Sequence, residues 1–123
     1  MAEVIATPKA PAAIGPYVQA KGTDTLVFVS GQLGMDAAGN LPADFETQAR
    51  NSFGNLCSIL EAAGTSLAKV LKTTVFLSDL ENFAKLNEIY AEYFKAPCPA
   101  RSCFEVARLP KDALVEIEVI AER

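Results

Sequence analysis

The chain has 123 residues, half of them hydrophobic, and a formal net charge of −4 at pH 7. This length suits one domain with a two-layer core and is short for two, so residues 1–123 are expected to form a single domain. The acidic balance argues against a general nucleic-acid binder, which needs a clustered lysine and arginine surface; the absence of histidine excludes serine–histidine catalysis and histidine-ligated zinc.

The beginning of the chain predicts two short strands and a loop. Residues 17–21 and 26–32 have strand character, and Gly22-Thr23-Asp24 is expected to form the turn between them. The segment 34–41, which contains Gly39-Asn40, is expected to be a loop or an irregular hairpin. The chain is therefore expected to open with strands rather than with a helix.

A long helix is predicted from Asp44 to Ala63. Apolar residues recur there at the spacing of one helical face; they are Phe45, Ala49, Phe53, Leu56, Leu60 and Ala63. Asp44 is suited to the N-cap position, because its carboxylate can accept a hydrogen bond from the first turn. Gly64 is suited to end the helix.

The second half of the chain predicts a strand, a helix and two further strands. Val70–Leu77 is a nearly continuous β-branched and apolar run, which is typical of a well-covered strand. Ser78 and Glu81 have the spacing of a capping box that opens a second helix. Its inward-facing residues are expected to be Phe83, Leu86, Tyr90 and Phe94. Residues 98–106 and 114–121 are expected to complete the sheet.

This order of elements predicts an α+β fold, a mixed β-sheet with both helices packed on one face. The opposite face is then left uncovered, although it carries valine, isoleucine and leucine among its charged residues. Because an exposed apolar face is unfavourable in a monomer, we expect the chain to associate.

The last two predicted strands are the most informative part of the sequence. Their alternating pattern predicts a β-hairpin with its turn at Pro110-Lys111-Asp112. Such a hairpin places the apolar residues on one face and gathers Arg101, Cys103, Glu116 and Glu118 on the other. An ionised carboxylate inside an apolar strand is costly without a partner. Glu116 therefore indicates a functional site or a subunit contact.

Cysteine usage and hydropathy narrow the class of protein further. Cys57, Cys98 and Cys103 are odd in number and include no Cys-x-x-Cys pair, so neither a disulfide framework nor a four-cysteine metal site is expected. No apolar run approaches the length that spans a bilayer, and the N-terminus lacks the basic and apolar stretches of a signal peptide. We expect a cytoplasmic protein with no membrane partner and no bound metal.

Four blocks of the sequence together resemble the RidA/YjgF family of enamine/imine deaminases. They occur in the family's order, at family-like spacing, and extend over nearly the whole chain. The blocks are Ala10–Tyr17, Val29–Gln32, Val70–Leu77, and Pro99-Ala100-Arg101-Ser102 together with Leu114–Glu118. The resemblance implies the fold of the trimeric chorismate mutases, and a homotrimer whose pockets lie in the clefts between subunits.

The resemblance also implies an activity. Proteins of this family hydrolyse reactive enamines and imines (2-aminoacrylate/2-iminopropanoate and 2-iminobutanoate) to 2-oxo acids and ammonia, without a metal or organic cofactor. Two alternatives remain open. Some proteins of this resemblance have been described as ribonucleases or translation inhibitors, which the acidic charge and missing histidine disfavour here. A non-catalytic, small-acid-binding or chaperone-like trimer is the other alternative.

The two principal candidate residues each have a structural and a functional interpretation. Arg101 is either a surface arginine at a strand start or, as the resemblance implies, the bidentate anchor of the substrate carboxylate. Glu116 is either salt-bridged across an interface or the acid/base that deprotonates water beside the imine carbon. Glu118 shares its face, and Glu116 is preferred because it occupies the motif's glutamate position. Like charges on one face raise the proton affinity of one carboxylate.

Five further residues are candidates for the pocket. Tyr17 is either a core aromatic or, as the resemblance implies, a residue that orients substrate or water. Ser30 and Gly31 form either an ordinary turn or a place where the backbone approaches the ligand closely. Cys103 is interpreted as a pocket wall and possible modification target rather than a catalytic thiolate. Asn87 is placed toward a neighbouring subunit's pocket.

The sequence departs from the family pattern just before Arg101. Only Lys95-Ala96-Pro97-Cys98 separate Tyr93-Phe94 from Pro99, where many relatives have a longer loop that ends in an aromatic residue. This difference is expected to bear on the width of the pocket and on substrate preference.

Overall fold

The computed structural model describes residues 2–123, and its framework is a six-stranded sheet in the order β1-β2-β3-β6-β4-β5. The strands are β1 (Glu3–Ile5), β2 (Ala20–Gly22), β3 (Leu26–Leu33), β4 (Val70–Leu77), β5 (Ala100–Glu105) and β6 (Val115–Glu122). Only β4 and β5 pair in parallel; the other neighbours are antiparallel. The sheet is therefore mixed, as the sequence predicts.

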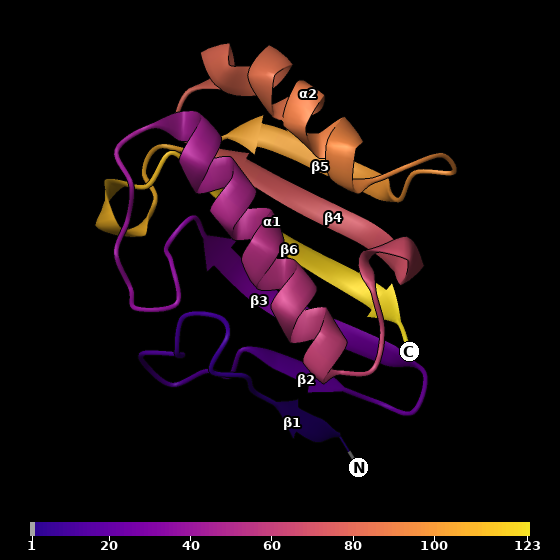
Figure 1. Ribbon diagram of the computed structural model, residues 1–123. Helices are drawn as coiled ribbons and strands as arrows, with labels where there is room; N and C mark the ends of the chain where they lie inside the picture. The colour runs from indigo at the N-terminus through magenta and orange to yellow at the C-terminus, as the bar shows by residue number, and fades with distance from the viewer. Residues whose placement is uncertain (1) are drawn as a thin grey trace.

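Two α-helices, α1 (Phe45–Ala62) and α2 (Phe83–Tyr93), lie side by side on the same face of the sheet (Figure 1). Single 3-10 turns, η1 (Leu67–Lys69), η2 (Leu80–Asn82) and η3 (Pro110–Asp112), occur in the connections. The core lies between the helices and the sheet, and its largest fully buried side chains include Phe53, Leu56, Leu86, Val75 and Ile117. None of the helices in residues 2–123 is both long and apolar enough to cross a membrane.

Local signals set the ends of α1 as predicted. Asp44 is the N-cap, and its carboxylate accepts a hydrogen bond of 2.9 Å from the backbone N–H of Thr47. Gly64 follows the helix with φ of +79°, a conformation that glycine adopts without steric cost. The predicted strand Val70–Leu77 also has the same bounds as β4. These elements are encoded by residues close together in the chain.

Three local predictions are wrong. The strand predicted over 17–21 begins only at Ala20, and β1 was not predicted. Before Ala20, the N–H of Tyr17 donates to the Gly15 carbonyl, and this turn replaces extended backbone. The start of the second helix is capped by Asp79, not Ser78: the Asp79 carboxylate accepts from the N–H of Glu81, and α2 itself begins after η2.

The predicted hairpin of the last two strands is also wrong. β5 and β6 are not neighbours, because β4 lies between them and pairs with both. Arg101 is in register with Thr73, and Thr73 with Val119, all on the face that the helices cover. Glu116 is in register with Phe76 on the uncovered face. Arg101 and Glu116 therefore project from opposite faces of the sheet.

Candidate active site

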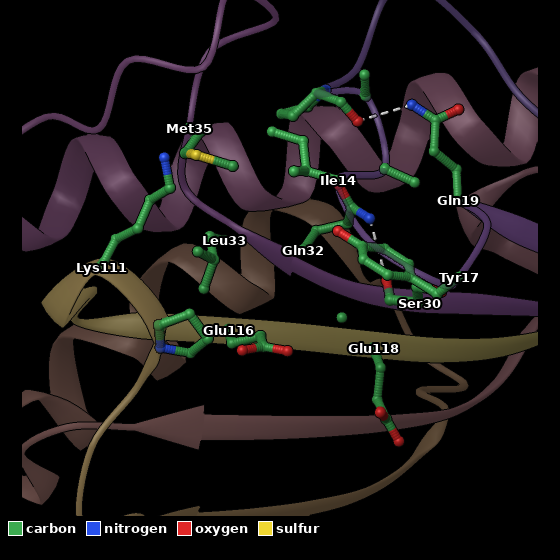
Figure 2. A pocket seen from close by; sticks show the side chains of 15 residues that line it. Ile14, Tyr17, Gln19, Ser30, Gln32, Leu33, Met35, Lys111, Glu116 and Glu118 are labelled. Carbon is green, nitrogen blue, oxygen red and sulfur yellow. Dashed lines mark hydrogen bonds between the residues drawn. The ribbon is translucent and has the colours of Figure 1, made fainter.

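A cavity of about 670 Å³ opens on the face of the sheet that the helices leave uncovered. It brings together four of the predicted residues, which are Tyr17, Ser30, Gly31 and Glu116, and also the alternative carboxylate, Glu118. Figure 2 shows Glu116 and Glu118 on β6, with the Glu118 side chain turned away from Tyr17 and with Lys111 at one side of the cavity. The walls come from the loop before β2, the end of β3, β6 and the η3 turn.

Gly31 lies beneath the carboxyl group of Glu116. The register of β3 against β6 shifts between Val29 and Gln32, so that Ser30 and Gly31 together oppose Glu118 in a β-bulge. A Cβ atom at position 31 would lie 1.9 Å from Oε2 of Glu116 and 2.8 Å from its Cδ. Gly31 was predicted to lie either in an ordinary turn or where the backbone approaches a ligand closely. In the folded chain the group close to Gly31 is the side chain of Glu116.

The carboxyl group of Glu116 is held in an environment that favours its protonated form. Burial raises its pKa above the ordinary glutamate value, and the negative charge of Glu118 raises it further. No lysine or arginine within residues 2–123 forms a salt bridge with it. A half-buried carboxyl group with a raised pKa, in a cavity, has the properties of an acid/base group.

Tyr17 and Ser30 sit differently in the cavity wall. Tyr17 is 52% exposed, which contradicts its interpretation as a core aromatic and leaves its side chain free to contact a ligand. The hydroxyl of Ser30 donates a 2.6 Å hydrogen bond to the Val18 carbonyl, and its N–H donates to the Gln19 carbonyl. Ser30 therefore ties the segment that carries Tyr17 to β3.

Gln19 is a residue of this wall that the sequence analysis missed. Its side chain is buried and accepts a 2.7 Å hydrogen bond from the Thr7 N–H, while its amide donates to the carbonyls of Thr7, Ala10 and Pro11 (Figure 2 shows one of these bonds). These bonds anchor the chain before Ile14 and Tyr17. A polar residue inside a predicted strand was the available signal, and it does not reveal partners so distant in sequence.

Arg101 occupies a different place, at the β5 edge of the sheet beneath α2. Its Nη1 donates a 2.8 Å hydrogen bond to Oδ1 of Asn87. Its guanidinium carbon lies 4.8 Å from the ring centre of Tyr90 and 5.6 Å from that of Phe83. Arg101 does not line the cavity that contains Glu116. The prediction that the two side chains share one face is wrong for a single chain, because the strand between them was not foreseen.

The other residues near Arg101 differ in part from prediction. Asn87 was placed toward a neighbouring subunit, but within the chain its side chain binds Arg101. Phe83 was expected to face inward and is 38% exposed. Cys103 shares the face of Arg101, as predicted, and packs against the core. Burial raises the pKa of its thiol, while the Arg101 charge lowers it, so the thiolate is not the favoured form. The segment 95–98 does not line the cavity.

A metal site is not assembled by the described residues: nowhere in 2–123 do three histidine, cysteine, aspartate or glutamate side chains come close enough to hold an ion. The chain instead presents two groups of polar side chains. One is an acid/base carboxyl in a cavity, and the other is an arginine without a carboxylate partner in the described chain. Together they could bind an anionic substrate and transfer protons.

Comparison with known proteins identifies close relatives over the full length. The model of the family described as Endoribonuclease L-PSP matches residues 7–123. A RutC family protein from Haemophilus influenzae is 52% identical over 100% of this chain and 98% of its own length. The 2-iminobutanoate/2-iminopropanoate deaminase of Escherichia coli strain K12 is 50% identical over 100% of this chain and 99% of its own. The crystal structure of E. coli TdcF with bound serine is 48% identical, with a TM-score of 0.95 over 98% of both chains.

Proposed function

The chain belongs to the Endoribonuclease L-PSP family, which includes the RidA/YjgF proteins, and on this premise we propose that it hydrolyses reactive 2-imino acids to 2-oxo acids and ammonia. The substrates proposed are 2-iminopropanoate and 2-iminobutanoate together with their enamine forms. The E. coli relative with half of its residues identical is named for this reaction. We also propose a cytoplasmic location.

The observation that carries the proposal is the position of Glu116. Its carboxyl group is half-buried over Gly31, carries a raised pKa, and faces a cavity with Tyr17 at its wall. A general base works best when its pKa lies close to the working pH. An ordinary exposed glutamate would be a weaker base than this one, so the environment suits proton abstraction from water.

The reaction can be written with this carboxylate as the only proton carrier. Glu116 accepts a proton from water while the water oxygen bonds to the imine carbon and the C=N electron pair moves to nitrogen. The carboxyl group then returns that proton to the nitrogen, which gives a carbinolamine. In the second half, the hydroxyl proton passes through Glu116 to the nitrogen, the C–N bond breaks, and ammonia leaves a 2-oxo acid. Tyr17 orients the water or the substrate.

Arg101 is proposed to anchor the substrate carboxylate, with Asn87 beside it. A guanidinium grips a carboxylate through two parallel hydrogen bonds and stays charged at any working pH. Because Arg101 and Glu116 project from opposite faces of one chain, a complete site needs Arg101 from one protomer and Glu116 from another. Ser30, Gly31 and Cys103 then shape the pocket wall.

This requirement is the reason to propose a homotrimer of the chorismate-mutase type, with its pockets between subunits. The uncovered face of the sheet carries Phe28 and Phe104, both 45% exposed, and Phe104 packs edge-on against Phe76. Burial of apolar area of this kind contributes roughly 25 cal/mol per Å². Association would therefore cover the open face and complete the site in the same step.

The experiment that tests the proposed activity uses an unstable imine that is generated within the assay mixture. A pyridoxal-phosphate dehydratase acting on serine generates 2-aminoacrylate, and the rate of pyruvate formation is followed with and without this protein. We expect the wild-type chain to accelerate pyruvate and ammonia release and Glu116→Gln to fail. Pyruvate formation at the spontaneous rate with the wild-type protein would overturn the proposal.

Ribonuclease activity is the principal competing function, since the family description contains that name. The cavity is lined by two carboxylates and a single lysine, which gives a polyanion such as RNA little attraction. Incubation of RNA with rigorously purified protein decides between the two. RNA cleavage that is lost in Glu116→Gln would favour the ribonuclease over the deaminase.

A further inference from the structure

The side chains around Arg101 indicate how this proposed carboxylate anchor is oriented before its ligand binds. Three residues of α2, Phe83, Asn87 and Tyr90, are spaced i, i+4 and i+7, so they share one face of the helix. All three contact the same guanidinium: Asn87 through a hydrogen bond of 2.8 Å, and the two aromatic rings at 5.6 and 4.8 Å. Three side chains on one face of α2 therefore contact a single side chain of β5.

The ring of Tyr90 is fixed from two sides before it meets Arg101. Its hydroxyl forms a 2.8 Å hydrogen bond with Oγ1 of Thr73, which is fully buried and is the register partner of Arg101 on β4. Its ring lies edge-on to Phe53 of α1, with centres 5.9 Å apart. A ring held in this way presents a constant face to the guanidinium.

The charge of Arg101 has no carboxylate counterpart within residues 2–123. A guanidinium has five N–H donors, and the side-chain contacts here use one of them, from Nη1 to Asn87. The aromatic faces attract the cation without consuming its donors, because the attraction acts on the ring's electron density and not on a lone pair. The remaining N–H groups stay free for a ligand.

We propose that Phe83 and Tyr90 form an aromatic clamp that holds the Arg101 guanidinium in a single orientation, ready to receive a small carboxylate ligand. The inference rests on the proposed function for the identity of that ligand. An arginine side chain loses rotamer entropy when it is ordered. In the clamp the side chain is already ordered when the protein folds, so this entropy loss does not oppose ligand binding. Phe83 and Tyr90 are positioning residues that act through Arg101.

The test replaces Phe83 with phenylalanines that carry one, two or three fluorine atoms. Fluorine withdraws electron density from the ring face and leaves its shape almost unchanged, so packing is retained while the cation–π attraction declines. Phe83 suits this experiment because its side chain is 38% exposed and lies outside the core cluster. The ligand is 2-oxobutanoate, and its Kd is measured by titration calorimetry.

We expect the Kd to rise stepwise with each fluorine, up to about 2- to 10-fold, which is the effect of leaving one rotamer-rich side chain to be ordered on binding. Phe83→Leu should match the trifluorinated ring, and Phe83→Trp should bind at least as tightly as the wild type. An unchanged Kd across the series, or tighter binding upon fluorination, would overturn the clamp. A loss seen with Phe83→Leu but not with fluorination would assign Phe83 to packing alone.

The matched control is Phe45, which begins α1 and makes no cation–π contact among the described residues; the same fluorinated series there should leave the Kd unchanged. A second measurement separates the clamp from the proposed function. NMR should find the Arg101 Hδ protons shifted upfield by the two rings, and Phe83→Leu should reduce that shift. Unshifted Hδ protons would refute the clamp, whereas shifted protons without 2-oxobutanoate binding would refute the proposed ligand.

Discussion

Replacing Gly31 with alanine is the most direct test of the position of Glu116. A Cβ atom at position 31 would lie 1.9 Å from Oε2 of Glu116, 2.8 Å from its Cδ and 3.1 Å from its Cγ. The carboxyl oxygen must retreat to at least 3.4 Å to reach ordinary contact, a movement of about 1.5 Å. The backbone of Gly31 does not have a positive φ, so alanine itself is compatible with the chain there.

The expected result is a large loss of activity with little loss of stability. A shift of about 1 Å in a reacting group can lower the rate about 10²-fold, and loss of a positioned base about 10²–10⁴-fold. We therefore expect kcat/KM to fall by about 10²-fold or more. The obstacle is the end of a flexible side chain, whose off-rotamer adjustment costs only about 0.5–1.5 kcal/mol.

The assay is pyruvate release from 2-aminoacrylate, combined with thermal unfolding of each variant. Gly54→Ala is the matched control, because nothing lies within 4 Å of the added Cβ in α1; it should keep full activity and gain up to about 1 kcal/mol of stability. Adding Glu116→Asp to Gly31→Ala shortens the displaced side chain and should restore part of the turnover. Wild-type turnover in Gly31→Ala would refute the assignment of Glu116 as a base held over Gly31.

Five further predictions concern the proposed site, its stability and its assembly. Arg101→Ala should abolish deamination with the assembly intact, and Arg101→Lys should be severely impaired because an ammonium lacks the planar two-pronged grip; wild-type turnover in the alanine variant would remove Arg101 from the site. Glu116→Gln should still bind 2-oxobutanoate but lose about 10²–10⁴-fold in kcat, whereas Glu118→Gln should change stability more than chemistry; the reverse result would mean that Glu118 is the base. Burial, and to a lesser extent the charge of Glu118, raise the pKa of Glu116, so kcat/KM should rise with pH through a midpoint above the ordinary glutamate pKa. Glu118→Gln should lower that midpoint. A midpoint that does not move would contradict the effect of the Glu118 charge on Glu116. Because its pKa is raised, the Glu116 carboxyl group binds a proton more tightly in the folded state than in the unfolded state. Its ionisation therefore lowers stability as the pH rises through the folded-state pKa. Glu116→Gln should unfold at a higher temperature than wild type at neutral pH and lose this advantage below the ordinary glutamate pKa. Light scattering should give about three times the 13.1 kDa monomer mass across dilution, and a stable, fully active monomer would defeat both the trimer and the shared site.

Features that depend on neighbouring residues were predictable from the sequence. The apolar spacing, Asp44 and Gly64 predicted α1, and the β-branched run predicted β4 with its bounds. The order of helices and strands was sufficient for the α+β class with a mixed sheet. The motif around Arg101 and Glu116 indicated the family, because it consists of residue types at set spacings. Each of these inferences needs only period, composition or order.

The arrangement of the candidate site depended on contacts that periodicity does not encode. Alternation identifies which residues of one strand share a face, but not which strand lies beside it. In the folded chain β4 lies between β5 and β6, and Arg101 and Glu116 project from opposite faces of the sheet. Gly31 was identifiable as a glycine at a strand end, yet its function as space for Glu116 arises only from the register of β3 against β6. The sequence by itself determined which chemical groups are present, and tertiary structure decided which of them meet, because pairing between distant strands is set by the packing of the whole sheet.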